Sequence, residues 1–178
     1  MVHEERNTGG ALVIMGVSGC GKSTLAALLA SRLGGAMIEG DDFHAAVSVA
    51  KMQAGHALDD ADRWPWLDRL GAAIGVAAQR KGAVAACSAL KRGYRDRLRT
   101  ASAVPLSFVL LDTEPGEIAR RLATRTGHYM SVSLLDSQLA TLERPGADEC
   151  ALTLDAGRSP EMLAADVLVW LGGALRLR

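Results

Sequence analysis

The chain has 178 residues, which is enough for one domain with a hydrophobic core and too few for two domains of ordinary size. Apolar residues make up 49% of it, and 20 basic residues balance 20 acidic ones, so the composition argues against disorder and against nucleic-acid binding. No export signal is visible, and no apolar run approaches the roughly 18 residues of a membrane span, so we expect a cytoplasmic protein without a membrane partner.

Short apolar runs of strand length alternate with amphipathic helical patterns along the chain. After a flexible tail at residues 1–10, the predicted strands are 11–15, 36–38, 83–87, 106–111 and 151–154. The predicted helices are 22–33, 64–80, 91–100, 115–125, 133–143 and one that begins at 159. This order predicts a single α/β domain over residues 1–178, with a parallel sheet of about five strands and helices on both faces.

A phosphate-binding loop stands between the first predicted strand and the first predicted helix, where residues 16–23 fit the pattern G-x-x-x-x-G-K-[ST]. Its backbone N–H groups and the helix N-terminus would surround the phosphates of a nucleotide. Lys22 would contact the β- and γ-phosphates, and the Ser23 hydroxyl would bind Mg²⁺. The loop therefore predicts ATP and Mg²⁺ as cofactors and a P-loop nucleoside-triphosphate hydrolase fold. The predicted ATP-binding residues are Gly16, Val17, Ser18, Gly19, Cys20, Gly21, Lys22, Ser23 and Thr24.

Two carboxylates follow the second predicted strand, at the sheet edge where open α/β folds bind ligands. A carboxylate there can orient or accept the proton of an attacking hydroxyl, and we assign this role to Asp41. Asp42 could instead cap a helix that begins near His44. Asp112 resembles the magnesium-binding residue at the end of a strand. Because Pro115 follows closely, we expect Asp112 to belong to the start of the next helix instead.

Two segments are candidates for binding the substrate and closing over it, and the first of them interrupts the alternation of strands and helices. Residues 40–63 are polar and form a candidate substrate-binding segment. Residues 120–135 carry Arg125 and His128 around a glycine, which suits a lid that brings cations onto the transferring phosphoryl group. Arg120 is explained more simply as a solvated helix residue. Trp64 and Trp66 flank Pro65, which suits the first turn of a helix, and we expect both indoles to pack.

These motifs together resemble the gluconokinases of the gluconate kinase type. The matching segments are 15–24, 40–44, 51–52, 62–67, 87–91, 94–96, 127–130, 138–143 and 145–146. The resemblance implies phosphorylation of D-gluconate by ATP to 6-phosphogluconate, with Mg²⁺ and often in homodimers. The chain departs from the family pattern at Ala45 and Ser48, where Pro and Asn are usual, and both changes fall in the substrate segment.

The resemblance also implies roles for single residues. Lys22, Asp41 and Arg125 would be catalytic, while Asp41, His44, Arg63, Lys91, Arg95 and His128 would hold the substrate. Cations and bidentate donors suit a sugar acid. Alternatives stay open, because Arg63 could pair with Asp59 or Asp60, and Lys91 and Arg95 could serve only their helix.

Other functions remain possible at this point. A kinase for another small hydroxy acid such as shikimate would be expected to show a glycine-rich turn after the third strand, where this chain has residues 87–91. A regulatory module could keep the loop and do no chemistry. A GTPase switch is disfavoured because the chain has no Asn-Lys-x-Asp motif for guanine.

Overall fold

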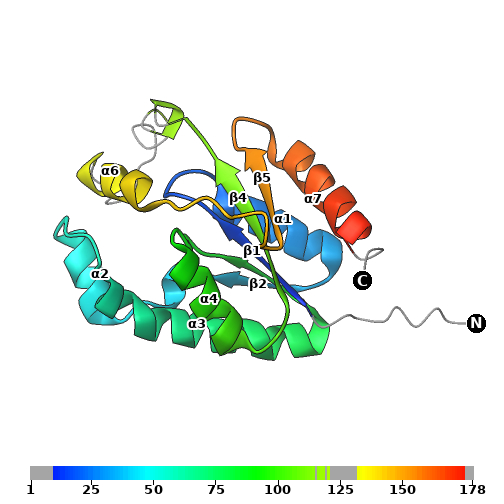
Figure 1. Ribbon diagram of the computed structural model, residues 1–178, viewed down its shortest axis with the longest axis horizontal. Coiled ribbons are helices and arrows are strands. Elements are labelled where there is room, and N and C mark those ends of the chain that lie inside the picture. Colours follow the sequence, from blue (N-terminus) through cyan, green and yellow to red (C-terminus); the bar gives the residue numbers. More distant parts are fainter. Residues whose placement is uncertain (1–9, 115, 119, 121–131, 175–178) are drawn as a thin grey trace, which may run out of the picture.

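A parallel five-stranded sheet forms the centre of the protein in the computed structural model, which describes residues 10–114, 116–118, 120 and 132–174. The strand order is β2-β3-β1-β4-β5, and each neighbouring pair is parallel (Figure 1). The strands are β1 (Ala11–Met15), β2 (Ala36–Glu39), β3 (Ala83–Ala86), β4 (Leu106–Asp112) and β5 (Ala151–Asp155). The predicted α/β class and all five predicted strands are confirmed.

Helices connect the strands and cover both faces of the sheet (Figure 1). They are α1 (Lys22–Leu33), η1 (Gly40–Phe43), α2 (Ala46–Gln53), α3 (Asp60–Lys81), α4 (Arg92–Ser102), α6 (Val132–Thr141) and α7 (Pro160–Ala174). None of the helices in the described part of the chain is long and apolar enough to cross a membrane.

The two faces of the sheet bury separate hydrophobic clusters, because successive side chains of a strand point to opposite faces. Leu12 and Ile14 of β1 pack with α1 and α7, whereas Val13 and Met15 pack with α3 and α4. A strand buried on both faces must be apolar throughout, which is why β1 is readable as a continuous apolar run.

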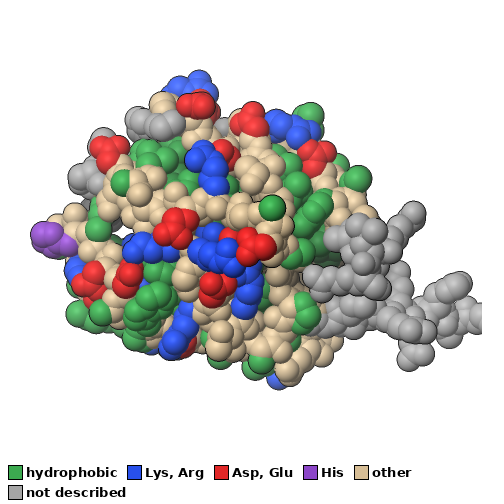
Figure 2. Space-filling view, viewed as in Figure 1, with side chains coloured by type: hydrophobic (Ala, Val, Ile, Leu, Met, Phe, Trp, Pro, Cys, Tyr) green, Lys and Arg blue, Asp and Glu red, His purple; other side chains and the backbone are tan. Residues whose placement is uncertain are grey.

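Charged side chains of both signs are interspersed on the surface seen in Figure 2.

The segment from residue 40 to 63 is more helical than its polar composition indicates. It contains η1, which was not predicted, and α2, which begins at Ala46, close to the helix considered near His44. Helix α3 begins at Asp60 instead of Trp64. Asp59 caps α3: its Oδ1 accepts from the Asp62 backbone N–H at 2.9 Å, and Asp62 Oδ2 accepts from the Asp59 N–H at 3.0 Å. Pro65 therefore lies inside α3, and its assignment to a first turn is wrong.

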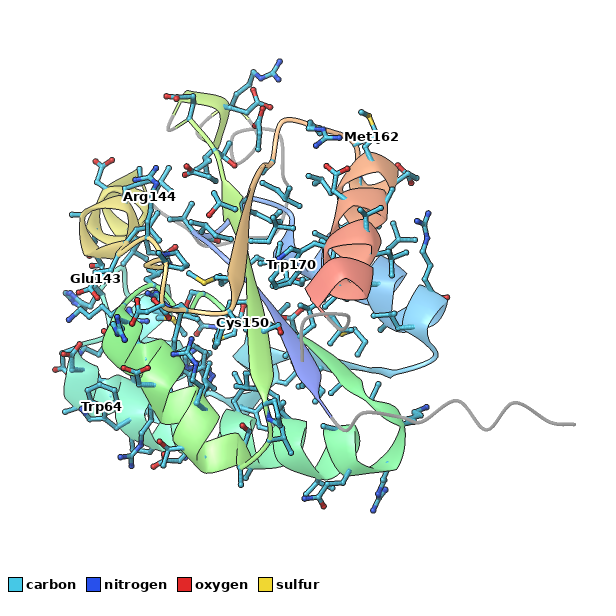
Figure 3. All side chains as sticks on the ribbon, turned by 45° about the vertical axis from the view of Figure 1, so that its right-hand side comes forward. Trp64, Glu143, Arg144, Cys150, Met162 and Trp170 are labelled. Carbon is cyan, nitrogen blue, oxygen red and sulfur yellow. The ribbon has the colours of Figure 1, made fainter. Side chains whose placement is uncertain are left out.

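Two assignments of aspartates are also corrected. Asp42 is not a helix cap, because it lies within η1 and the residue that precedes α2 is Ala45. Asp112 is the last residue of β4 and not the start of a helix, and both of its carboxylate oxygens accept from Arg144 at 2.9 Å. Figure 3 shows Arg144 just beyond α6, in the segment that leads to Cys150 and β5. Most of the predicted 115–125 helix and of the 120–135 lid lies outside the described residues.

Candidate active site

The phosphate-binding loop leaves the carboxyl end of β1 and enters α1. Gly16 and Gly21 have φ angles of 138° and 100°, which side chains on L-residues rarely tolerate. A Cβ at Gly16 would also lie 2.8 Å from the Leu111 carbonyl oxygen. The first turn of α1 contains no acidic residue, so the positive end of the helix is left for an anion. Lys22 reaches back across the loop, and its Nζ donates to the Val17 carbonyl at 3.0 Å.

Helix α6 contacts the same loop from the opposite side of the site. The Ser18 backbone N–H donates to Gln138 Oε1 at 2.7 Å. Because Gln138 accepts from a loop amide, its position is coupled to the conformation of the loop.

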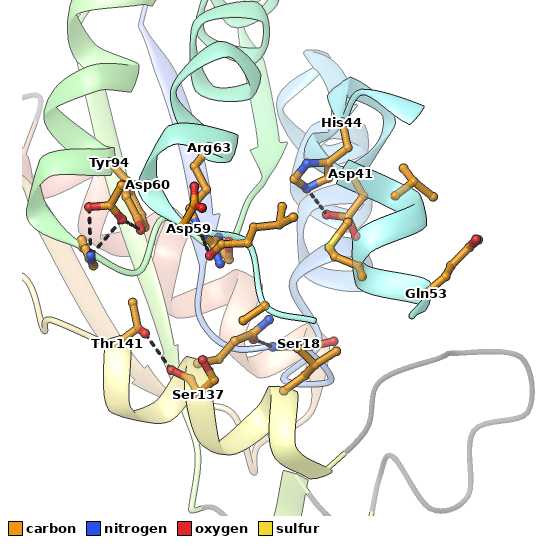
Figure 4. A pocket seen from close by; sticks show the side chains of 18 of the residues that line it. Ser18, Asp41, His44, Gln53, Asp59, Asp60, Arg63, Tyr94, Ser137 and Thr141 are labelled. Atoms are coloured by element: carbon orange, nitrogen blue, oxygen red, sulfur yellow. Dashed lines mark hydrogen bonds and ion pairs between the residues drawn. The ribbon is translucent and has the colours of Figure 1, made fainter. Parts of the chain in front are cut away.

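A cavity of about 680 Å³ opens beside the loop. Its wall is contributed by the loop, η1, α2, the start of α3, the turn after β3, α4 and α6 (Figure 4). The charged and polar side chains that line it are Ser18, Lys22, Asp41, His44, Gln53, Asp59, Asp60, Arg63, Ser88, Lys91, Tyr94, Ser137, Gln138 and Thr141. Its size and polar lining suit a small hydrophilic acceptor next to a nucleotide.

Asp41 and His44 form one side of this cavity (Figure 4). A Cβ on Gly40 would lie 2.4 Å from the Ala86 carbonyl oxygen, so only glycine lets η1 approach β3 this closely. Trp66 Nε1 donates to the Gly40 carbonyl at 2.7 Å, and the His44 ring stacks on Trp66 with centroids 4.2 Å apart. The turn that presents Asp41 is therefore held by packing and by a hydrogen bond.

The two side chains differ in exposure and in charge. The Asp41 side chain is 81% exposed and that of His44 only 5%, with 3.8 Å between His44 Nε2 and Asp41 Oδ1. Burial lowers the pKa of His44, and Arg63 and Arg69 add to this effect against the opposing charge of Asp41. His44 is consequently neutral at pH 7 and suits a hydroxyl group better than an anion.

The cations Arg63 and Lys91, together with Asp60 and Tyr94, form the side of the cavity opposite Asp41 and His44. Lys91 Nζ donates to both oxygens of Asp60 at 2.9 and 3.1 Å, and the Tyr94 hydroxyl donates to Asp60 Oδ1 at 2.5 Å. The Tyr94 and Lys91 hydrogen bonds lower the pKa of Asp60, which in turn raises the pKa of Lys91. Arg63 lies with its guanidinium carbon 5.4 Å from the Tyr94 ring centroid.

Arg63 does not form the pairs considered from the sequence. Lys51 of α2 forms ion pairs with Asp59 at 3.5 Å and with Asp62 at 2.5 Å, and Lys91 forms an ion pair with Asp60. Arg63 Nε instead donates to the Leu58 carbonyl at 3.3 Å. Its charge is thus presented to the cavity beside Lys91.

The structure brings together most of the residues singled out in the sequence. Lys22, Asp41, His44, Arg63 and Lys91 all line the cavity. Ser23 and Thr24 are exposed in the first turn of α1. Arg125 and His128 lie outside the described residues.

The expectation that Arg95 binds the substrate is wrong. It is 0% exposed, does not line the cavity, and its Nε and Nη2 donate to the two oxygens of Glu149 at 2.7 Å each. The family resemblance suggested Arg95 as a substrate-binding residue, but the sequence does not reveal that its face of α4 is covered by residues 143–149.

Further polar residues that line the cavity were assigned no role from the sequence, among them Asp60, Ser88, Tyr94 and Gln138. Asp60, Ser88 and Tyr94 stand within three residues of Arg63, Lys91 and Arg95, and Gln138 stands in a segment that resembles the gluconokinases. The contact of Gln138 with the loop spans 120 residues, which no local pattern shows.

Phosphate groups and an acceptor hydroxyl can therefore meet between Lys22 and Asp41, which is the arrangement of a P-loop kinase that acts on a small molecule. A family model described as an AAA domain matches residues 12–145. The gluconokinase of Gluconobacter oxydans (strain 621H) is 47% identical, with 88% of each chain covered. The thermoresistant gluconokinase of Escherichia coli (strain K12) is 40% identical over 88% of this chain and 90% of its own. The crystal structure of a gluconokinase from Sinorhizobium meliloti 1021 superposes with a TM-score of 0.84 at 39% identity, covering 95% of both chains. The chain belongs to the gluconokinase family.

Proposed function

We propose that this protein transfers the γ-phosphoryl group of ATP to D-gluconate and produces 6-phospho-D-gluconate. The observation that carries the proposal is the cavity that places Lys22 of the phosphate-binding loop, the Asp41 carboxylate and the cations Arg63 and Lys91 around one space. A sugar acid has a carboxylate at one end and hydroxyls along its length, so it matches a cavity with both cations and hydroxyl partners.

The nucleotide end of the reaction rests on the loop. Its backbone amides and the N-terminus of α1 bind the β- and γ-phosphates, and Lys22 exchanges its contact with the Val17 carbonyl for the phosphates. No group of three or more His, Cys, Asp or Glu that could hold a metal occurs among the described residues, which fits an ion bound mainly by nucleotide oxygens. Ser23 would supply the protein oxygen for Mg²⁺, which neutralises charge on the phosphates when bound.

The two sides of the cavity bind the two ends of the acceptor molecule. Asp41 orients the attacking hydroxyl and takes its proton as the bond to phosphorus forms. Neutral His44 holds a hydroxyl from beside it. Arg63 and Lys91 attract the carboxylate of the acid at the other end, and the Asp60–Tyr94 pair fixes Lys91.

Further parts of the proposal rest on the sequence patterns and on the family resemblance. Arg125 and His128, in a lid over residues 120–135, would close on the phosphates, while residues 40–63 would serve as the acceptor segment of one domain spanning residues 1–178. Homodimers and a cytoplasmic location are proposed on the same ground.

Two alternatives are less well supported. A kinase for another hydroxy acid was considered because Ala45 and Ser48 depart from the family pattern, but neither residue lines the cavity. Ser48 is buried in α2 and Ala45 precedes that helix, so these residues act on α2 instead of touching the acceptor. A non-catalytic module is disfavoured because the acceptor cavity and Asp41 are both retained.

The test is ADP release by the purified protein with Mg-ATP. The acceptors to compare are D-gluconate, other aldonic acids, shikimate, glucose and none. The proposal expects strong stimulation by D-gluconate alone. Stimulation by another acid would leave a kinase with a different substrate, and no stimulation by any acceptor would favour the regulatory module.

A further inference from the structure

Arg95 is a fully buried charged side chain whose guanidinium binds two separate parts of the chain. Besides its two bonds to Glu149, its Nη1 donates to the carbonyls of Ala89, Leu90 and Glu143 at 3.2, 3.3 and 3.0 Å. Taking a guanidinium out of water is unfavourable unless its donors are matched, and here all three nitrogens have acceptors. A side chain bound in this way holds its partners in one arrangement.

The first partner is the turn between β3 and α4. Ala89 has a φ of 44°, a left-handed conformation that is unfavourable for a residue other than glycine. Its carbonyl and the next one both accept from Arg95, so the guanidinium stabilises the turn at its strained residue. The same turn carries Ser88 and Lys91 into the cavity, and the Ser88 carbonyl accepts from the Gly16 N–H of the phosphate-binding loop at 3.2 Å.

The second partner is the segment between α6 and β5, whose ends are marked by Glu143 and Cys150 in Figure 3. The Glu143 N–H donates to the Leu90 carbonyl at 2.8 Å, and its side chain accepts from the Arg92 N–H at the start of α4 at 2.7 Å. The bonds to Arg95, together with Arg99, hold the pKa of Glu149 at about 2, so Glu149 stays ionised at neutral pH. This segment fixes the end of α6, the helix from which Gln138 reaches the phosphate-binding loop.

We propose that Arg95 is a positioning residue for phosphoryl transfer, which locks the 88–91 turn to the 143–149 segment and so places Lys91 and Ser88 against the acceptor. It acts through the backbone of that turn and touches neither substrate. This inference rests on the proposed function for its kinetic part only.

The test compares Arg95→Lys with a matched variant on the same helix. Arg97 also forms a bidentate pair, with its Nε and Nη2 donating to Asp68 at 2.5 and 2.7 Å, but the pair is on the surface and away from the cavity. Lysine keeps the charge and loses the fork of donors in both variants. Two quantities are measured: the KM for D-gluconate, and hydrogen–deuterium exchange at the Gly16, Glu143 and Gly146 amides.

Arg95→Lys is expected to raise the KM for D-gluconate about tenfold or more, because several charge-assisted hydrogen bonds are lost. The three amides should exchange faster, since Gly16 and Glu143 donate into the 88–91 turn and Gly146 donates to Glu149 at 3.2 Å. Arg97→Lys should leave both quantities as in the unchanged protein. If Arg95→Lys does not fold, Glu149→Gln, which weakens the same clamp without removing the guanidinium, is expected to give the same two effects.

Failure of the proposed function and failure of the role of Arg95 give different results. If the unchanged protein does not phosphorylate D-gluconate, the proposed function fails, while the exchange measurement still decides about Arg95. A raised KM without faster local exchange would mean that Arg95 acts on substrate directly and would overturn the inference. Exchange that rises evenly over the whole protein, with an unchanged KM, would show a purely structural role and would overturn it as well.

Discussion

At the scale of single residues, the site separates exposed groups that can react from buried groups that hold them. The Asp41 side chain faces solvent, whereas its support consists of the buried Trp66, the stacked His44 and the Gly40 carbonyl. Asp42 is the immediate neighbour of Asp41 in η1, but it does not line the cavity. Two adjacent carboxylates therefore have different expected roles, which makes them a matched pair.

Asp41→Asn is expected to lower turnover of D-gluconate by about 10²–10⁴-fold, the usual effect of removing an acid–base group. The dissociation constant for ATP should change by no more than about twofold, because the phosphate-binding loop does not include Asp41. Steady-state kinetics and nucleotide titration measure the two effects.

Asp42→Asn is the control and should leave turnover nearly unchanged. Equal losses in both variants would point to a general effect of charge or of η1, and unchanged turnover in Asp41→Asn would remove Asp41 from its role.

Sequence patterns predicted the residues that follow strands and failed for residues whose partners are distant. Lys22 was found from the phosphate-binding motif, and Asp41 because parallel strands place their carboxyl ends at one edge. Arg95 was misassigned because its acceptor Glu149 lies 54 residues away. The role of Tyr94 was missed for a similar reason, since its hydroxyl meets Asp60 across 34 residues.

At the scale of elements, the 40–63 segment shows the limit of pattern reading. Helix α2 is eight residues long, and among its side chains only Ser48 is buried, so it has no apolar stripe to recognise. The start of α3 is encoded by the Asp59 capping box, which uses Asp62 where the familiar pattern has Glu or Gln. By contrast, α1 and the five strands have strong apolar patterns and were predicted almost to the residue.

The close packing of α3 against α4 depends on Gly71 and Gly75, one turn apart on α3. A Cβ at Gly75 would lie 2.3 Å from the Ser102 carbonyl oxygen, and one at Gly71 would lie 2.5 Å from Ala101 Cβ. Backbone and Cβ atoms cannot move aside as a flexible side chain can. Since α3 carries Arg63 and α4 follows Lys91, this packing also fixes how these two cations lie relative to each other on one side of the cavity.

Gly75→Ala is expected to reduce the free energy of unfolding by about 1–3 kcal/mol, as is typical when extra atoms enter a well-packed contact. The control is Gly172→Ala in α7, where a Cβ would have no atom within 4 Å. That change should stabilise the protein by about 0.5–1 kcal/mol, because alanine is the better helix former. Urea unfolding measures both, and a stabilising Gly75→Ala would contradict the packing described.

At the scale of the whole molecule, the site arises from the order of the strands. The central strand β1 delivers the phosphate-binding loop, and its neighbour β3 delivers Ser88 and Lys91. The edge strand β2 delivers Asp41 and, with η1, His44. Residues far apart in the chain thus converge at the carboxyl edge of one sheet, where Figure 1 shows α2 and α6 on the same side of the molecule.

The overall charge of the chain does not indicate this site. Basic and acidic residues balance over the sequence, yet Arg63 and Lys91 lie together in the cavity, where Lys91 forms an ion pair with Asp60. The carboxylate of an acceptor would meet these two cations on one side of the cavity, although Asp41, Asp59 and Asp60 also line it.

The most direct test of the account is to identify the product by ³¹P NMR after the protein is incubated with Mg-ATP and D-gluconate. We expect loss of the γ-phosphate signal together with a new phosphomonoester coupled to the two protons on C6 of gluconate. Inorganic phosphate without a phosphomonoester, or a phosphate on another carbon, would contradict the proposal that Asp41 directs the terminal hydroxyl of gluconate to the nucleotide.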